Sequence, residues 1–494
     1  MTNTMTDSGV GEAGCHFVLV PLMAQGHTIP MIDLARLLAQ RDAQVTFITT
    51  PFNASRIRTT IDRVHDSGLP IKFVELPFPC KELDLPEGCE NLDVVPSTEL
   101  AHNFFDGLRL LAKPLETYLR QLPSPPSCMI VDFCHPWTRE VAHNLQIPRL
   151  TFFSMCCFTL LCIHNVSHYK VFDNITDEHE AYAVPGLTHK ILVTKAQAPE
   201  WFSAPGWEKF AKEVKDAQLA ADGIVVNTFD DLEPSYINDY QKAMGKKVWA
   251  VGPFSLYNKD LTDMVVRGNK TSIDANRCMS WLNAREPKSV VYVSFGTLTF
   301  VGASQLMEVG LGLEASSHPF VWVIKNNEMS HEVEEWLSKG FEERTQSRGF
   351  IIKGWAPQVM ILSHPAIGGF MTHCGWNSTL EGVSAGVPMI TWPHFGDQFL
   401  NERMIVDVLG IGVSIRVVSP TRWAGNNGND EDHKRLSAMK DDVERAIRSV
   451  MEGEEAEERR RRVTELGKKA REAMSEGSSY ANMTNLIRSF TRNE

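Results

Sequence analysis

The sequence predicts an α/β protein built from two Rossmann-like, doubly wound domains. Short apolar runs of strand length alternate with helical segments along most of the chain, which is typical of parallel sheets covered by helices. The alternation occurs in two series, which are separated by a polar stretch. A chain of 494 residues is also too long to fold around one hydrophobic core. Together these observations predict two domains of the same class.

The first series begins with HFVLVPL at 16–22, a continuous apolar run as expected for a central strand buried on both faces. A helix follows from about Pro30, since proline is favoured at the start of a helix. Two stretches, 78–95 and 170–220, break the alternation and are predicted to be irregular, the second running over the mouth of a pocket. The other strands of this domain are expected at 44–50, 71–77, 128–133, 148–153, 223–229 and 247–253.

The polar stretch 254–274 has no periodicity and is predicted to be a linker between the domains. Charged helices from 436 to about 474 close the second domain, and a final helix with an apolar stripe is expected to pack back across the linker. The strands of the second series are expected at 289–297, 320–325, 349–355, 367–373, 388–393 and 411–417. The predicted organisation is an N-terminal domain at 1–253, the linker at 254–274, a C-terminal domain at 275–475 and a terminal helix at 476–494.

Composition and charge exclude several functional classes. The chain is 43% apolar and 22% charged, as an ordinary globular enzyme is, and its net charge of −12 would repel nucleic acid and anionic membrane surfaces. The longest apolar run, 150–163, is too short to span a bilayer, and the first residues do not form a secretory signal. The ten cysteines include no CxxC pair. We therefore expect a cytoplasmic protein with reduced thiols, no membrane span and no nucleic-acid partner.

The stretch 355–398 carries the strongest chemical signal in the sequence. It is predicted to contain a strand, a sharp turn at 374–376, a helix opening at Asn377 and a second strand. The first N–H groups of a helix have no partner inside the helix, and the helix dipole is positive there, so such a helix start binds an anion without a metal. Gly375 would let the backbone approach the anion closely. The side chains of His373, Asn377 and Ser378 are further donors at this turn.

Other residues of the stretch suit the remaining parts of a nucleotide sugar. Glu381 lies one helical turn further and can accept hydrogen bonds from vicinal hydroxyls, Trp355 offers a flat stacking surface, and Asp397 with Gln398 forms a second hydroxyl-reading pair. The competing interpretation is a buried βα repeat in which His373 and the tryptophans fill the core. A packing unit has no use for so many polar groups at one turn, so we favour a pocket for a nucleotide diphosphate sugar.

Two residues of the first series form a candidate general base. His27 follows the first strand in a loop with Gly26, and Asp132 lies at the end of the strand 128–133. Ligands of open α/β sheets bind at the carboxyl ends of the strands, where both side chains can reach one crevice. A carboxylate beside an imidazole fixes its tautomer and stabilises its charged form. The alternative is a simple buried ion pair without a chemical role.

Over its full length and without a gap, the stretch 355–398 resembles the signature box of the plant secondary-product UDP-glycosyltransferases, the family 1 enzymes of the two-domain GT-B fold. The resemblance implies that the two domains face each other across a cleft. It further implies that the N-terminal domain binds the acceptor and the C-terminal domain the UDP-sugar. His27 matches the base of the family, and Asp132 matches the residue that orients it.

The same resemblance implies a set of donor-binding residues. Trp355 would stack on uracil, Gln358 and Glu381 would hold the ribose, and Trp376 would contact the sugar together with Asp397 and Gln398. The full implied set is Gly26, Ser294, Gly296, Trp355, Ala356, Gln358, His373, Gly375, Trp376, Asn377, Ser378, Glu381, Asp397 and Gln398.

The implied reaction is an inverting transfer of a hexose from the UDP-sugar to a hydroxyl of a small hydrophobic plant metabolite. Flavonoids and other phenolics, terpenoids, steroids and hormones are all admissible acceptors. The amide of Gln398 can donate and accept, and in the family a Gln here goes with glucose whereas a His goes with galactose, so UDP-glucose is the expected donor. The UDP-sugar is a co-substrate, no cofactor is expected, and the protein is expected to be a monomer.

Other motifs give weaker signals. Asp430, Glu431 and Asp432 spell the DxD of metal-dependent sugar transferases, but they lie in a polar loop without a preceding strand, and no HExxH spacing occurs, so we predict no metal. The GLGLEA run at 310–315 lacks the third glycine of a dinucleotide fingerprint and lies in a helical segment. Two alternatives remain: an oxidoreductase with a nucleotide cofactor on a Rossmann sheet, and a catalytically inactive nucleotide-sugar binder.

Overall fold

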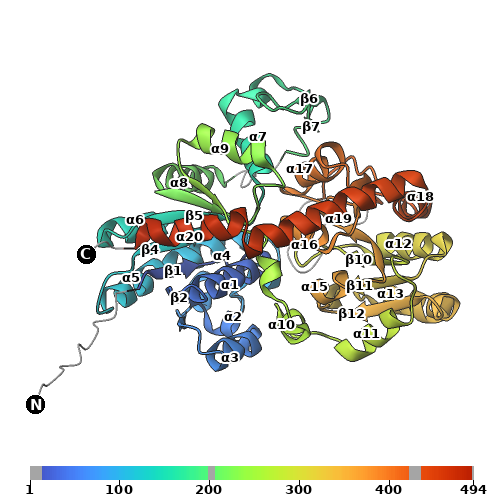
Figure 1. The fold of residues 1–494 in the computed structure, drawn as a ribbon, viewed down its shortest axis with the longest axis horizontal. Helices are drawn as coiled ribbons and strands as arrows, with labels where there is room; N and C mark the ends of the chain where they lie inside the picture. Colours follow the sequence, from blue (N-terminus) through green and yellow to red (C-terminus); the bar gives the residue numbers. More distant parts are fainter. Residues whose placement is uncertain (1–13, 199–205, 422–435, 492–494) are drawn as a thin grey trace, which may run out of the picture.

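The protein is described by a computed structural model over residues 14–198, 206–421 and 436–491. The predicted fold class is confirmed, because two parallel sheets lie in two lobes, the first formed by the N-terminal half of the chain and the second by the C-terminal half (Figure 1). A small antiparallel hairpin is the only other sheet within these ranges.

The N-terminal sheet has seven parallel strands in the order β3-β2-β1-β4-β5-β8-β9. Its strands are β1 (His16–Val20), β2 (Gln44–Thr49), β3 (Ile71–Glu75), β4 (Cys128–Asp132), β5 (Arg149–Phe153), β8 (Gly223–Val226) and β9 (Val248–Ala250). The helices of this lobe are α1 (Gln25–Ala39), α2 (Pro51–Arg56), α3 (Arg58–Asp66), α4 (Ala101–Leu110), α5 (Ala112–Arg120), α6 (Thr138–Leu145), α7 (Cys157–His168), α8 (Glu208–Ala220) and α9 (Pro234–Met244).

The C-terminal sheet has six parallel strands in the order β12-β11-β10-β13-β14-β15. Its strands are β10 (Val290–Ser294), β11 (Phe320–Ile324), β12 (Gly349–Lys353), β13 (Ile367–Thr372), β14 (Met389–Thr391) and β15 (Gly412–Ser414). The helices of this lobe are α11 (Ala275–Asn283), α12 (Ala303–Ser316), α13 (His331–Trp336), α14 (Glu342–Thr345), α15 (Gln358–Leu362), α16 (Trp376–Ala385), α17 (Gln398–Arg403), α18 (Lys440–Met451) and α19 (Glu454–Ser475).

Both sheets reverse their strand order at the equivalent place. β1 pairs with β2 on one side and with β4 on the other, and β10 pairs in the same way with β11 and β13. At such a reversal the connections leave the sheet in opposite directions and open a crevice at the carboxyl ends of the strands. The four strands that border the two crevices are apolar almost throughout, because parallel strands are covered on both faces.

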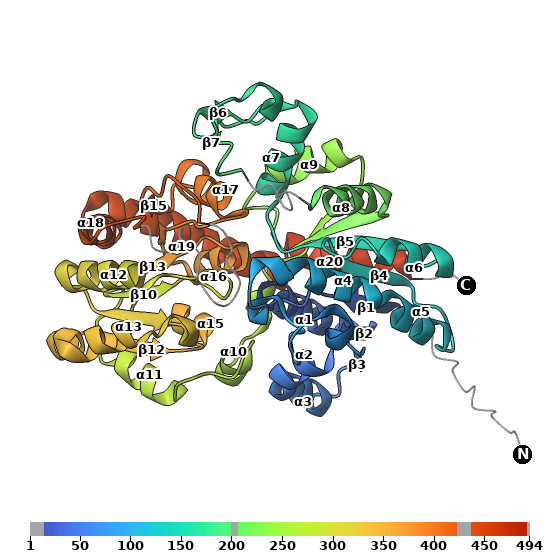
Figure 2. The same ribbon diagram turned by 180° about the vertical axis from the view of Figure 1, so that it is seen from behind.

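Two stretches are more ordered than the sequence predicts. The stretch 254–274 contains the 3-10 helix η5 (Phe254–Tyr257) and helix α10 (Leu261–Val266), and α10 lies between the lobes when they are viewed from either side (Figures 1 and 2). The stretch 170–220 contains α8 and the hairpin of β6 (Ala181–Ala183) and β7 (Leu192–Thr194). These elements bury few apolar side chains, so the hydrophobic pattern does not reveal them.

The last helix, α20 (Ser478–Phe490), returns to the N-terminal lobe, where the described chain ends (Figure 1). The Ser479 hydroxyl donates to the carbonyl of Gly252 at 2.6 Å. Met483 and Leu486 are buried in the same hydrophobic cluster as Phe17 of β1. The same cluster includes Phe254 of η5, so the end of the chain packs on the N-terminal lobe beside the start of the stretch 254–274.

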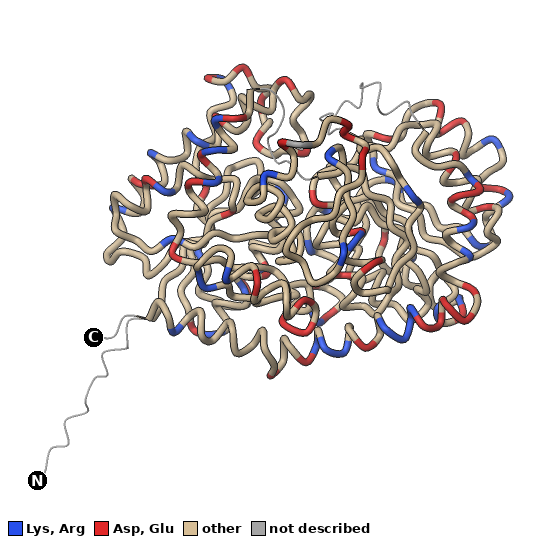
Figure 3. Tube along the Cα trace, turned by 90° about the horizontal axis from the view of Figure 1, so that it is seen from above, with Lys and Arg blue, Asp and Glu red and all other residues tan. Residues whose placement is uncertain are grey.

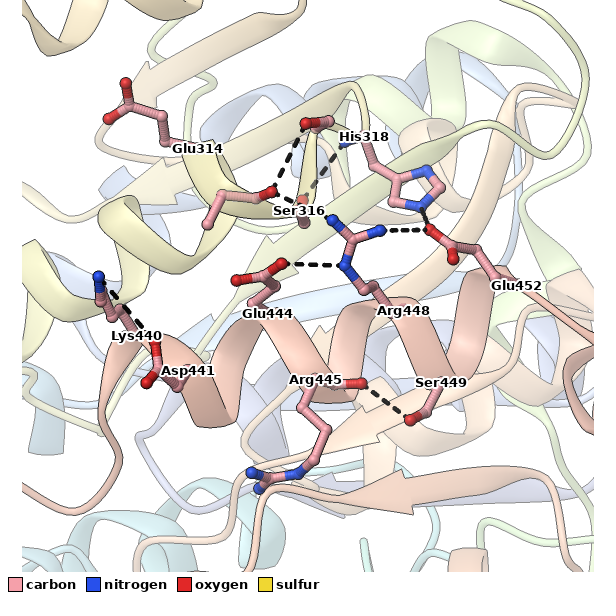
Figure 4. Close-up of polar contacts among 12 residues, drawn as sticks. Glu314, Ser316, His318, Lys440, Asp441, Glu444, Arg445, Arg448, Ser449 and Glu452 are labelled. Carbon is pink, nitrogen blue, oxygen red and sulfur yellow. Dashed lines mark hydrogen bonds and ion pairs between the residues drawn. The ribbon is translucent and has the colours of Figure 1, made fainter.

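Charged residues are spread over the protein, and Figure 3 shows basic and acidic positions interspersed along the trace. Figure 4 shows one such cluster, in which Arg448 of α18 binds Glu444 at 2.9 Å and Glu452 at 3.1 Å, while His318 binds the same Glu452 at 3.0 Å. This cluster ties the end of α12 to α18. Among the helices of the described ranges, none is both long and apolar enough to cross a membrane.

Candidate active site

His27 and Asp132 lie side by side at the crevice of the N-terminal sheet. His27 is in the first turn of α1, directly after β1, and Asp132 is the last residue of the neighbouring strand β4. His27 Nδ1 is 2.7 Å from Asp132 Oδ2. Asp132 is fully buried, and the N–H of Cys134 donates to its Oδ1 at 3.1 Å. The structure thus brings together the two residues that were paired from the sequence.

The electrostatics of the pair leave one nitrogen free for chemistry. Burial by itself raises the pKa of Asp132, but the charge and hydrogen bond of His27 hold this pKa below its usual range. An ionised carboxylate only accepts hydrogen bonds, so Nδ1 of His27 is the donor, and the neutral ring presents Nε2 as an acceptor. Burial by itself lowers the pKa of His27, but the charge and hydrogen bond of Asp132 outweigh it and raise this pKa above 6.5.

Asp397, from the C-terminal domain, lies close enough for its charge to raise the pKa of His27 further. Burial raises the pKa of Asp397 itself to about 6, although a hydrogen bond of 2.8 Å from Asn401 opposes this rise. Asn401 also donates to the carbonyl of Cys374 at 2.9 Å and accepts from the hydroxyl of Thr159 at 3.0 Å. Because Thr159 belongs to α7, this amide joins the two domains beside the site.

The start of α16 lies at the crevice of the C-terminal sheet, after β13. Gly375 is the residue before the helix, and the first bond inside α16 runs from the N–H of Thr379 to the carbonyl of Gly375 at 3.0 Å. The N–H groups at 376–378 therefore point out of the helix end, where the dipole is positive. The preceding residue, Cys374, has a φ of 66°, a left-handed conformation that a non-glycine residue adopts only under constraint.

His373 is a partly buried, neutral side chain at the turn before α16. Burial and the charge of Lys325 lower the pKa of His373 to about 3, so the ring is neutral. A Cβ atom on Gly296 or on Gly375 would lie 2.4 Å from ring atoms of His373. Gly375 is therefore needed to accommodate this ring, a packing role beside the predicted one of letting an anion approach closely. Nδ1 of His373 has no hydrogen-bond partner among the described residues.

A pocket between the domains collects most of the implied donor-binding residues. Gln25, Gly26 and Ile29 line it from the N-terminal domain, and Met264 and Arg267 line it from the linker. The implied residues that line it from the C-terminal domain are Ser294, Gly296, Trp355, Ala356, Gln358, Asn377, Ser378 and Glu381. The implied residues outside this lining are His373, Gly375, Trp376, Asp397 and Gln398.

Two implied residues make contacts between the domains. The indole N–H of Trp376 donates to the carbonyl of Asn227 at 2.7 Å, so the backbone N–H is the group of Trp376 that remains for a ligand. The side-chain amide of Asn377 donates to the carbonyl of Gly26. Asn377 was predicted to donate to an anion, and in the structure one N–H of its amide connects α16 to the first turn of α1, which carries His27.

Gln398 is also engaged within the protein. Its Oε1 accepts from the N–H groups of His394 at 2.8 Å and Phe395 at 3.2 Å. In this orientation the amide oxygen that was predicted to accept from a sugar is occupied within the protein, and the NH₂ group is left to face a ligand.

Several pocket residues were not predicted from the sequence, among them Lys325, Tyr292 and Arg267. Lys325 directly follows strand β11. Its position at the carboxyl end of a predicted strand could have indicated a pocket residue. Tyr292 lies within β10, and its hydroxyl donates to Gln358 Oε1 at 3.3 Å. Arg267 lies in the linker, where the sequence has no pattern that points to a site. Lys325 and Arg267 place cationic side chains at the pocket, and both are paired: Lys325 with Glu328 at 3.1 Å, and Arg267 with two carboxylates.

The residues described by the structure contain no group of three or more His, Cys, Asp or Glu side chains that could hold a metal ion. The acidic triplet at 430–432, which was not expected to bind one, lies outside the described residues. The ten cysteines all lie within the described part of the chain and form no disulfide.

Comparison with known proteins identifies both halves of the chain. The family model described as "Glycosyltransferase, N-terminal domain" matches residues 14–256, and the model described as "UDP-glucoronosyl and UDP-glucosyl transferase" matches residues 259–422. UDP-glycosyltransferase 73C3 from Arabidopsis thaliana is 46% identical over 96% of this chain and 95% of its own length. UDP-glycosyltransferase 73C11 from Barbarea vulgaris is 44% identical over the same shares of the two chains.

Solved structures give the same result. The structure of UGT73P12 from Glycyrrhiza uralensis, complexed with glycyrrhetinic acid 3-O-monoglucuronide, superposes with a TM-score of 0.88 at 34% identity, over 97% of this chain and 96% of that chain. UGT89C1 from Arabidopsis thaliana, complexed with UDP-L-rhamnose, superposes with a TM-score of 0.73 at 28% identity, over 97% and 99% of the two chains. UGT2 from Phytolacca americana, complexed with UDP-2fluoro-glucose and pterostilbene, gives 0.76 at 25% identity, over 97% and 100%.

The ionisation of His27 can be tested directly. We expect the pKa of His27 to lie above 6.5 in an NMR titration of the ring protons, with the signal assigned by its loss in His27→Gln. In Asp132→Asn the ring keeps its burial but loses the carboxylate charge, so its pKa should fall below 6.5. An unchanged pKa in Asp132→Asn would contradict the electrostatic account of the pair.

Proposed function

The chain belongs to the plant family 1 UDP-glycosyltransferases, and from this premise we propose that it transfers glucose from UDP-glucose to a hydroxyl of a small hydrophobic acceptor, inverting the anomeric carbon. The observation that carries the proposal is the His27–Asp132 pair, 2.7 Å apart, with Asp397 of the other domain beside it. Membership of this family excludes the oxidoreductase alternative. The intact pair argues against the inactive binder, because a protein that only binds a nucleotide sugar needs no buried base.

In the proposed reaction, Nε2 of His27 takes the proton of the acceptor hydroxyl as its oxygen attacks the anomeric carbon of the sugar. The bond from that carbon to the diphosphate oxygen breaks on the opposite face, which inverts the centre. Asp132 stabilises the imidazolium that forms, because its carboxylate already accepts from Nδ1. The raised pKa of His27 favours the protonated ring after the transfer, and the base is in its active neutral form only above this pKa.

UDP departs with new negative charge on its terminal phosphate. The N–H groups at 376–378 at the start of α16 and the cation of Lys325 support this departure, since both present positive charge at the carboxyl end of the C-terminal sheet. The neutral His373 could contribute only a single N–H. We propose on this basis that the reaction needs no metal ion.

We further propose that the acceptor is a terpenoid, a phenolic compound or a molecule of similar size and polarity. Solved relatives hold glycyrrhetinic acid 3-O-monoglucuronide and pterostilbene, respectively. The donor sugar differs among the solved relatives, because a third one holds UDP-L-rhamnose. The preference for glucose therefore depends on Gln398 and on its neighbours in this chain.

The donor preference can be tested by direct competition. With UDP-[¹³C₆]glucose and unlabelled UDP-galactose at equal concentration, and a panel of phenols and terpenoids, we expect the labelled product to predominate by at least roughly tenfold. The NH₂ group of Gln398 should favour a sugar whose hydroxyl has the orientation found in glucose. Mass spectrometry separates the labelled glucoside from the unlabelled galactoside. Gln398→His is the matched variant and should move the ratio toward galactose. A predominance of galactoside in the unaltered protein would refute the assignment.

Chelation tests the account of UDP departure. We expect turnover to persist in EDTA and to be insensitive to added Mg²⁺, because helix N–H groups and a lysine stabilise the leaving diphosphate. UDP release in metal-depleted buffer is the measurement. Loss of turnover in EDTA, with recovery on addition of Mg²⁺, would show that this stabilisation is insufficient.

His27 and Asp132 should act as one unit. His27→Ala should lower kcat by about a hundred- to ten-thousand-fold, the usual contribution of a positioned base, and leave UDP-sugar affinity nearly unchanged. Asp132→Ala should cost much of the same factor, and the double variant should be little worse than His27→Ala alone. An acidic phenol, already partly ionised, should be affected least. If the two losses multiply, or if donor affinity falls instead of kcat, the pair is only structural.

A further inference from the structure

Arg267 links three parts of the chain at the edge of the pocket. Its Nε donates to Asp33 Oδ2 of α1 at 2.8 Å, and its Nη1 donates to Glu381 Oε1 of α16. Asp33 and Glu381 are 2% and 6% exposed, and the side chain of Arg267 is 11% exposed. One guanidinium of the linker thus bridges two buried carboxylates from different domains.

The residues next to Arg267 are fitted into the wall of the same pocket. Gly268 has a φ of 97°, and a Cβ atom there would lie 2.5 Å from the ring of Trp355. The side chain of Asn269 accepts from Gln25 at 2.9 Å. The backbone of Trp355 is held by Ser272, whose hydroxyl accepts from the N–H of Trp355 at 2.8 Å and whose N–H donates to its carbonyl at 3.0 Å. The linker therefore forms part of the wall of the donor pocket.

We infer that Arg267 is a positioning residue for the UDP-sugar, because it fixes the carboxylate of Glu381 in the orientation that receives the ribose hydroxyls. The inference rests on the proposed function, since it takes the ribose of the nucleotide as the ligand of Glu381. It extends the donor site from the C-terminal domain to the linker.

The hydrogen-bond geometry of Glu381 favours this role. Its Oε1 accepts from Arg267, and its Oε2 accepts from Gln358 Nε2 at 2.7 Å, so both oxygens are held in place. Each carboxylate oxygen can accept more than one hydrogen bond, so lone pairs remain for the vicinal hydroxyls of a ribose. Charged and bidentate contacts of arginine are also more rigid than those of lysine. Without Arg267, only the amide of Gln358 would hold this carboxylate.

The guanidinium is itself fixed from the N-terminal domain. Asp33 Oδ1 accepts from Asn258 at 3.0 Å, and Asn258 in turn accepts from Arg36 at 3.1 Å. Asp263 of α10 binds both Arg36 and Arg63. These contacts hold the linker against α1 and α3, so the position of Glu381 in one domain depends on side chains of the other.

The ribose hydroxyls allow a direct test. The affinities of UDP and 2′,3′-dideoxy-UDP are measured by calorimetry on the full-length protein and on Arg267→Gln. We expect Arg267→Gln to weaken UDP binding by roughly tenfold, the effect of one charged hydrogen bond, and to leave 2′,3′-dideoxy-UDP binding within about twofold. Arg267→Lys should retain part of the preference for UDP over 2′,3′-dideoxy-UDP, since lysine keeps the charge but lacks the planar donor geometry of arginine.

A matched control is Arg63→Gln, which breaks the ion pair of 2.7 Å with Asp263 in the same linker but lies outside the pocket lining. It should leave the preference for UDP over 2′,3′-dideoxy-UDP unchanged. Should Arg267→Gln not fold, the double variant Asp33→Asn/Arg267→Gln removes the second buried charge as well and is measured in its place.

If Arg267→Gln weakens the binding of both nucleotides equally, Arg267 has a merely structural role and the inference is overturned. Tighter binding of UDP by this variant would also overturn it, because Arg267 would then obstruct the ribose site. If the unaltered protein binds UDP and 2′,3′-dideoxy-UDP equally, Glu381 does not hold the ribose and the inference is wrong. In that case, continued transfer of sugar from UDP-glucose would show that the proposed function still stands.

Discussion

The site depends on one constraint, which is that the carboxyl edges of two parallel sheets open into the same space. The segments that follow β1, β10, β11 and β12 all contribute to one pocket. The start of α16, after β13, contributes as well. A base, an anion-binding helix end and a stacking surface come from separate βα units, and no single unit could present them together. The two-lobed arrangement therefore supplies the convergence on which the chemistry depends.

This convergence requires several carboxylates to be buried, and each is held by specific partners. Asp132 accepts from His27 and a backbone N–H, Asp397 accepts from Asn401, and Glu381 accepts from Arg267 and Gln358. An unpaired buried charge would cost several kcal/mol, so the partners determine which protonation state each group adopts. Asp397, whose hydrogen bond is with a neutral amide, keeps a raised pKa, whereas the pKa of Asp132, with an imidazole partner, is lowered.

The fold and the ends of the strands could be predicted because they follow from local patterns. Continuous apolar runs mark parallel strands, and His27 and Asp132 were found because each lies where such a run ends. The roles of Arg267 and Asn401 could not be found in this way, because their partners lie 114 and 242 positions away in the sequence. The orientation of the Gln398 amide depends likewise on two N–H groups of its own turn, a detail that periodicity does not contain.

The contacts between the lobes also differ from one side of the molecule to the other. Around the pocket they are hydrogen bonds and one ion-pair relay: Trp376 to Asn227, Asn377 to Gly26, Thr159 to Asn401, and Arg267 to Glu381. At the return of α20 they combine the buried apolar side chains of Met483 and Leu486 with hydrogen bonds such as that from Ser479 to Gly252. A neutral hydrogen bond contributes only about 0.5–1.5 kcal/mol net, since water replaces it when it opens. Buried apolar side chains have no such replacement in water. Opening the contact at α20 would therefore expose apolar surface to water, whereas opening the hydrogen bonds around the pocket would not.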